Sequence, residues 1–169
     1  MRLERLEATQ RPEKLKAVFD GEALTVSASL CVQFSLCAGM ELDEEAFSAL
    51  KAAVAKEAAR ERAVRILTAS AVSERELEKR LLQKGMLPSD AADAVAWLKE
   101  HRFLDDAATA AQLVDSAVRK GYGRARVKNI LYEKGIPKDL WDEALARIPA
   151  MDDAIDRFLA AKLRGRPAD

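Results

Sequence analysis

The amino-acid sequence predicts a mainly α-helical protein, in which tandem three-helix repeats form an elongated stack behind a small N-terminal β-hairpin segment. Hydrophobic residues make up 49% of the 169 residues and charged residues 33%, whereas glycine and proline are scarce, and this composition is typical of helical proteins. The segment 73–106 also recurs in degenerate form at 123–153. A helical unit repeated at this period buries one face against its neighbour and presents another to an extended partner, which indicates a binding protein.

The two copies share the residues that begin and end helices. Lys84-Gly85 recurs as Lys134-Gly135, and Asp105-Asp106 recurs as Asp152-Asp153. A proline follows each Lys-Gly pair within a few residues. Each complete copy is therefore expected to contain three short helices, of which one begins near the aspartate pair, one ends at Lys-Gly and one begins at the proline.

Residues 1–39 are predicted to form the β-hairpin extension. Asp20-Gly21 is a typical hairpin turn, and it separates the stretches 15–19 and 24–27, in which hydrophobic residues alternate with others. Residues 2–9 are a candidate third strand. The segment that follows the hairpin, Ser29–Cys37, fits either a strand or a short helix. We favour a helix there, with Ser29 as its N-cap and Gly39 as its C-terminal stop.

Residues 40–104 are predicted to hold a lead-in helix and the first helical repeat. The lead-in helix begins at Asp43, followed by two glutamates that suit the positive end of the helix dipole. Hydrophobic residues then recur at helical spacing. The helix either continues past Lys56 or bends there.

The remaining helices of the first repeat have clear boundary signals. Ser73 and Glu76 form a capping box that begins a helix, and this helix ends at Gly85. Pro88 begins the next helix. Phe103 and Leu104 are expected to fill the junction between the repeats.

Residues 105–150 are predicted to form the second three-helix repeat. Its first helix begins at Asp105 or Asp106 and continues to Lys120, after which two glycines break the chain. Residues 151–169 are predicted to hold only the first helix of an incomplete third repeat, followed by a tail.

The sequence contains no recognisable catalytic or metal-binding constellation. Its two cysteines, Cys31 and Cys37, lie in a hydrophobic stretch without a nearby histidine, and we interpret them as packing residues. His101 lies at a predicted helix end, where an imidazole can bond to terminal carbonyls. We therefore expect no enzyme, no cofactor and no metal. No hydrophobic stretch is long enough to span a bilayer, so a cytoplasmic protein without a membrane partner is expected.

Four segments together resemble the RecX family of bacterial RecA regulators. They are SERELEKRLLQKG, FLDD, RKGYG and LYEKGI, and the resemblance covers residues 58–153. It implies a monomeric regulator, an inhibitor of the RecA recombinase, that binds RecA filaments on single-stranded DNA and thereby restrains recombination and DNA repair. The family usually has three repeats, whereas here the third stops after its first helix.

The charge at the start of the Lys-Gly helix is reversed between the two copies. Three glutamates in the first copy align with Arg124, Arg126 and Lys128 in the second, where cations oppose the helix dipole. Residues 119–134 carry a net charge of +5 with two interleaved tyrosines. Such a patch can bind phosphates or an acidic protein surface, although an ordinary solvated helix face is the competing interpretation. The candidate partner- or DNA-binding residues are Arg119, Lys120, Tyr122, Arg124, Arg126, Lys128, Tyr132 and Lys134.

An alternative function uses the same residues. The protein would then be a helical DNA-binding module that acts directly on nucleic acid through the 119–134 patch, without RecA. Salt dependence would separate the two functions, because phosphate-driven binding weakens steeply with salt.

Overall fold

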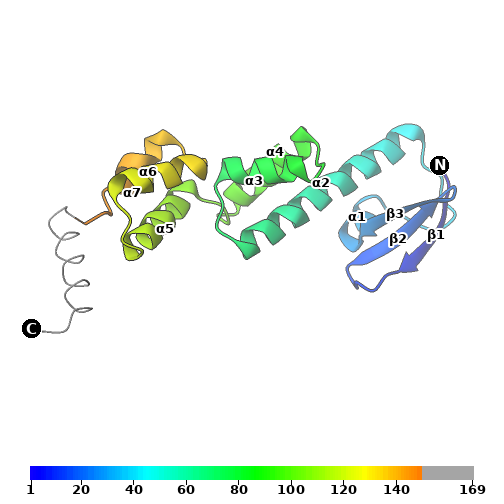
Figure 1. The fold of residues 1–169 in the computed structure, drawn as a ribbon. Helices are drawn as coiled ribbons and strands as arrows, with labels where there is room; N and C mark the ends of the chain where they lie inside the picture. The colour runs from blue at the N-terminus through cyan, green and yellow to red at the C-terminus, as the bar shows by residue number, and fades with distance from the viewer. Residues whose placement is uncertain (150–169) are drawn as a thin grey trace, which may run out of the picture.

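The computed structural model describes residues 1–149, and the predicted third-repeat helix at 151–169 lies outside the described residues. The chain is mainly helical, with a small sheet at its N-terminal end. Figure 1 shows three units in a row: the sheet with α1, then α2 to α4, then α5 to α7. The predicted architecture of tandem three-helix repeats in an elongated stack is confirmed.

The predicted hairpin is part of a three-stranded antiparallel sheet. The strands are β1 (Leu3–Ala8), β2 (Lys14–Phe19) and β3 (Glu22–Ser27), in the spatial order β1-β2-β3. The candidate third strand is therefore real. Asp20 and Gly21 both have positive φ, at 45° and 87°, as the tight hairpin turn between β2 and β3 requires.

The ambiguous segment after the sheet is helical, but its predicted ends are wrong. Helix α1 spans Ala28–Gln33, and its N-cap is Ser27, whose hydroxyl accepts a hydrogen bond from the Leu30 N–H at 3.1 Å. Ser27 is the better cap because the end of β3 already holds it in the extended conformation that an N-cap needs. Gly39 does not end this helix. Its N–H instead donates to the Leu3 carbonyl, which joins the 39–42 segment to β1.

Helix α2 (Glu44–Ala69) connects the sheet to the first repeat without a break. Asp43 caps it by accepting from the Ala46 N–H at 2.7 Å. At 26 residues it is about 39 Å long. Its first half packs on the sheet, where the rings of Phe47 and Phe19 meet edge to face at 5.0 Å. Its second half contributes to the core of the first repeat.

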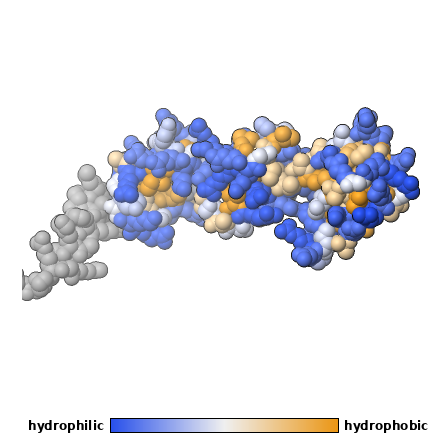
Figure 2. Space-filling model, turned by 45° about the vertical axis from the view of Figure 1, so that its right-hand side comes forward, coloured by the Kyte–Doolittle hydropathy of each residue, from blue (hydrophilic) through white to orange (hydrophobic). Residues whose placement is uncertain are grey.

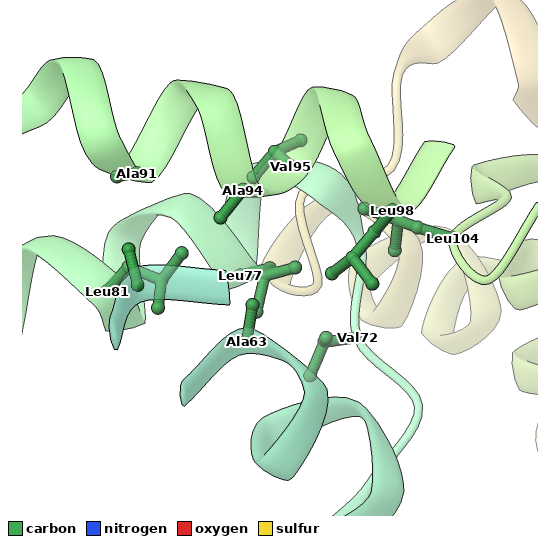
Figure 3. Close-up of a cluster of buried hydrophobic side chains, with 10 residues drawn as sticks. Ala63, Val72, Leu77, Leu81, Ala91, Ala94, Val95, Leu98 and Leu104 are labelled. Atoms are coloured by element: carbon green, nitrogen blue, oxygen red, sulfur yellow. The ribbon is translucent and has the colours of Figure 1, made fainter. Parts of the chain in front are cut away.

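The first repeat is completed by α3 (Glu74–Gln83) and α4 (Pro88–Glu100). Ser73 caps α3 by accepting from the Glu76 N–H at 3.1 Å, and Gly85 follows its end with φ 86°, as predicted. Side chains from three helices and from the loops that follow α2 and α4 point toward one another in its core (Figure 3). The buried members are Ala59, Ala63, Val72, Leu77, Leu81, Ala91, Ala94, Val95, Leu98 and Leu104.

The second repeat consists of α5 (Asp106–Arg119), α6 (Arg124–Glu133), a 3-10 turn (Lys138–Leu140) and α7 (Trp141–Leu145). The third helix thus begins after Pro137 as a 3-10 turn. The core has its own buried residues, Ala110, Val114, Ala117, Val127, Leu131, Ile136, Ala144 and Leu145. Because the buried hydrophobic residues of the two repeats form separate clusters, each repeat is packed mainly on itself.

A small polar joint connects the repeats. The Ser73 hydroxyl donates to the Lys134 carbonyl, and the Glu74 N–H donates to a carboxylate oxygen of Asp106 at 2.8 Å. Leu104 is buried at this end of the first repeat, as expected, whereas Phe103 is 67% exposed. The expectation that Phe103 fills the junction is wrong, because the chain turns after α4 in a way that directs only Leu104 inward.

The division at residues 39, 104 and 150 remains a prediction. The packing places the start of α2 with the sheet and not with the first repeat, because Phe47 and Leu50, which follow the boundary at residue 39, belong to the same buried cluster as the sheet. Within residues 1–149, no helix combines the length and the hydrophobicity needed to cross a membrane.

Candidate partner-binding surface of the second repeat

The turn between α5 and α6 brings the basic residues of both helices together. Gly121 has φ 79°, a conformation that favours glycine, and the Tyr122 N–H donates to the Ala117 carbonyl at 3.0 Å. The chain therefore passes from α5 into α6 within four residues. Arg119 and Lys120, at the end of α5, then lie next to the N-terminus of α6.

Tyr122 organises two of the predicted cations. Its ring is half-buried against the core of the second repeat. The guanidinium carbon of Arg126 lies 3.8 Å from the ring centroid, and the Lys120 Nζ lies 6.0 Å from it. Cation–π contacts of this kind hold a long side chain in place while its polar atoms stay available to solvent. Tyr122 is therefore a support for the basic surface.

The N-terminus of α6 lacks the local compensation that α3 has. Gly123 occupies the N-cap position and provides no side-chain hydrogen bond, and the first turn contains no acidic residue. In α3, by contrast, Ser73 caps the helix and the first turn holds Glu74 and Glu76. Free amide groups and positive side chains thus share one end of α6, where an external anion would be favoured.

The predicted cations have no ion pair with any carboxylate of the described residues 1–149. Within residues 1–149, no salt bridge involves any of the six predicted cations, which are Arg119, Lys120, Arg124, Arg126, Lys128 and Lys134. The nearby carboxylate of Asp115 is bound instead by Arg147, at 2.7 and 3.0 Å. This contact, helped by Arg119, holds the pKa of Asp115 below its usual value. On the face shown in Figure 2, hydrophilic side chains cover most of the second repeat.

The structure divides the α6 cations between two flanks. At about 100° per residue, Arg124, Lys128 and Tyr132 follow one another along one flank of the helix. Arg126 lies roughly 160° around the helix from Arg124, on the flank of Tyr122. The buried residues of α6, Val127 and Leu131, face the core between these flanks. A single flat partner therefore does not contact all three cations equally.

Tyr132 and Lys134 lie at the other end of α6, next to the first repeat. Tyr132 is 71% exposed, and the carbonyl of Lys134 belongs to the inter-repeat joint. Together with Arg75 and Lys79 of α3 they line a groove of about 500 Å³. The sequence did not single out Arg75 and Lys79, because a repeat pattern does not show which helices of different copies come into contact.

The structure thus places Lys120 and Arg126 against Tyr122, and Tyr132 and Lys134 in a separate groove. No group of three or more His, Cys, Asp or Glu side chains in the described part of the chain could hold a metal ion. The geometry is that of an exposed surface rich in cations.

Comparison with known proteins identifies relatives of both repeats. Family models for the first and the second three-helix domain of RecX match residues 59–98 and 105–145. The regulatory proteins RecX of Escherichia coli O1:K1 and of E. coli K12 are each 34% identical over 117 residues, which cover 63% of this chain and 70% of theirs. A crystal structure of a regulatory protein RecX has the same fold, with a TM-score of 0.76 at 24% identity over 99% of this chain and 86% of that one.

Proposed function

The chain belongs to the RecX family, whose members are regulatory proteins and not enzymes, and we propose that it regulates the RecA recombinase by binding the filament that RecA forms on single-stranded DNA. The proposed effect is inhibition of recombination and of recombinational DNA repair. We further propose that the protein acts as a monomer in the cytoplasm, where this filament forms.

The shape of the molecule supports this proposal. Two three-helix repeats follow each other in a row, each with its own core, so the same backbone unit occurs twice along one direction (Figure 1). A helical polymer also presents the same surface repeatedly along its axis. An elongated repeat protein is suited to contact successive subunits of such a polymer.

The observation that carries the proposal is the positive charge of residues 119–134, which has no ion-pair partner among the described residues 1–149. Arginines occupy the first turn of α6, where the helix dipole disfavours them by a few tenths of a kcal/mol each. The stability of the helix does not account for arginines at these positions, because acidic residues, which the dipole favours, occupy the same positions in α3. An anionic partner, either DNA phosphate in the filament or carboxylates of the recombinase, would supply the missing compensation.

The test is a titration of the protein into RecA-coated single-stranded DNA while ATP hydrolysis is measured. The wild-type protein is expected to reduce hydrolysis. The triple variant R124E/R126E/K128E carries the charges that α3 already tolerates, so it should fold normally and inhibit at least tenfold less well, a loss of about 1.4 kcal/mol.

A charge-matched control makes this test specific. The triple variant R11E/K16E/R65E changes the net charge equally at exposed residues outside the second repeat. It should inhibit like the wild type, and circular dichroism should show native helix content for both variants. Equal inhibition by the wild type and a folded R124E/R126E/K128E variant would show that this surface is only solvated.

A second candidate function is direct DNA binding through residues 119–134. The observation in its favour is the contact between Arg126 and Tyr122, which holds a guanidinium group at the surface on the ring that Lys120 also contacts. Binding to phosphates would then weaken steeply with salt, and removing three contacts should reduce the salt slope by roughly 2 for single-stranded DNA. Strong binding to DNA without RecA, together with normal ATP hydrolysis by filaments, would favour this function.

A further inference from the structure

The C-terminal end of α4 differs from those of α3, α5 and α6. After α3, α5 and α6 the chain turns through a glycine with positive φ, namely Gly85, Gly121 or Gly135. After α4 the same position is held by Arg102, with φ 60°. The turn is closed by the Phe103 N–H, which donates to the Leu98 carbonyl at 2.9 Å.

An arginine in this conformation is unfavourable for stability, because its Cβ crowds the backbone where glycine has none. Three neighbouring turns in the same protein show that glycine serves this purpose well. Strain retained at one position, where glycine would relieve it, points to a role for the side chain itself. The side chain of Arg102 and its surroundings are therefore informative.

Arg102 lies beside a row of aromatic rings on the surface of the first repeat. The rings of Trp97 and His101 lie 5.0 Å apart, and those of His101 and Phe103 are parallel within 4° at 6.5 Å. The His101 Nδ1 bonds to the Trp97 carbonyl at 2.8 Å, which fixes the central ring. Arg60 covers Trp97 at 5.1 Å, so the row begins with a cation and ends at the exposed ring of Phe103.

Phe103 and Arg102 also border a groove of about 500 Å³ between the end of α2 and the start of α5. Its other walls carry uncharged polar side chains, including Thr68, Ser70 and Gln112, and one carboxylate, that of Asp105. A groove that combines an aromatic face, a guanidinium group and hydroxyl or amide groups matches the three parts of a nucleotide. These parts are the flat base, the phosphate and the polar base edge.

We propose that this groove binds single-stranded nucleic acid, with a base stacked on Phe103 and the adjacent phosphate bound by Arg102. The carboxylate of Asp105 also lines this groove, where it accepts hydrogen bonds from the amides of Ala107 and Ala108. The exposed carboxylate of Glu100 lies close by in the sequence. Stacking therefore contributes more here than charge neutralisation, and binding at this groove depends only weakly on salt. The proposal deepens the function proposed above, on which its role at the filament rests, but the binding itself does not require RecA.

The experiment measures fluorescence anisotropy of a labelled oligothymidylate with the full-length protein. F103A should weaken binding roughly fivefold or more, because stacking of a base on an aromatic ring is lost. R102G should weaken binding and at the same time raise the melting temperature, because glycine relieves the positive φ. V32A, at a 79% exposed residue of α1, is the matched control and should change neither quantity.

An abasic oligonucleotide of equal length and charge separates the groove from the basic surface of the second repeat. The wild type should bind it more weakly than oligothymidylate, and F103A should bind both alike. The R124E/R126E/K128E variant should still prefer the oligonucleotide with bases, even where it no longer inhibits RecA. If R124E/R126E/K128E still inhibits RecA as well as the wild type does, the proposed function is contradicted. The groove proposal is not affected by that result.

Two results would overturn the groove proposal. One is equal affinity of the wild type for the abasic and the base-containing oligonucleotide. The other is an F103A protein that binds oligothymidylate normally but no longer inhibits RecA filaments, which would assign the aromatic row to a protein contact.

Discussion

The carboxylate of Asp106 caps a helix of the neighbouring repeat, since one of its oxygens accepts the Glu74 N–H at 2.8 Å. Asp105, directly before it, caps α5 itself through the amides of Ala107 and Ala108. The two aspartates that begin α5 therefore have different roles, one within the second repeat and one between repeats. Because Asp106 is only 8% exposed, its burial raises the pKa of the carboxyl group.

This raised pKa predicts how acid affects Asp106→Asn. Between the unfolded and the folded pKa, the native protein binds a proton at Asp106 that the unfolded chain does not, so this group contributes more stability as the pH falls. Asparagine does not titrate but can still accept the Glu74 N–H. On acidification from pH 7, the wild type should therefore gain free energy of unfolding relative to the variant. Urea denaturation of both proteins at several pH values measures this difference in the free energy of unfolding. A difference that does not change with pH would contradict a raised pKa at Asp106.

Gly85 and Gly135 should respond unequally to alanine. Both have positive φ, so Gly85→Ala is expected to cost about 1 kcal/mol. A Cβ at Gly85 would contact nothing within 4 Å, whereas one at Gly135 would lie 3.2 Å from both the Arg75 Cβ and the Ser73 Oγ. Gly135→Ala should therefore destabilise by at least about 1 kcal/mol more, because it also overpacks the joint. Urea denaturation measures the free energy of unfolding of the two variants. Equal losses would mean that Ser73 and Arg75 move away from the added Cβ at no cost.

The two flanks of α6 should contribute separately to filament binding. R124E/K128E changes the flank that leads to Tyr132, and K120E/R126E changes the cations around Tyr122. Because the flanks face different directions, one double variant should account for most of the loss seen in the triple variant. The measurement is the inhibition of RecA ATP hydrolysis by each double variant, compared with that by the triple variant. Equal partial losses would instead indicate a partner that surrounds the helix.

The repeats should fold without the N-terminal sheet if the deletion ends within α2. Removal of residues 1–55 leaves both repeat cores complete, so cooperative thermal unfolding should persist. Removal of residues 1–39 alone exposes Phe47 and Leu50, which pack on the sheet, and should cause aggregation or binding of a hydrophobic dye. Circular dichroism and dye fluorescence follow both proteins. Loss of cooperative unfolding in the shorter protein would show that the sheet supports the repeats.

Features decided within a few residues could be predicted from the sequence. The Asp20-Gly21 turn, the Ser73 cap and the helix ends at Gly85 and Gly135 follow from side-chain size and hydrogen bonding in one turn of backbone. The error at Ser29 also has a local cause. Two serines competed for the N-cap of α1, and the end of β3 decided in favour of Ser27.

Relations between segments distant in the sequence required the tertiary structure. The amino-acid order showed two copies of a helical unit, but it did not show that Asp106 would cap Glu74 or that Gly135 would pack on Arg75. It also grouped Arg124, Arg126 and Lys128 as one patch and placed Phe103 in a junction, where the folded chain exposes it. Caps and turns depend on local backbone energies that each residue carries with it, whereas the joint, the groove and the two flanks depend on how whole helices are positioned by the cores that they bury.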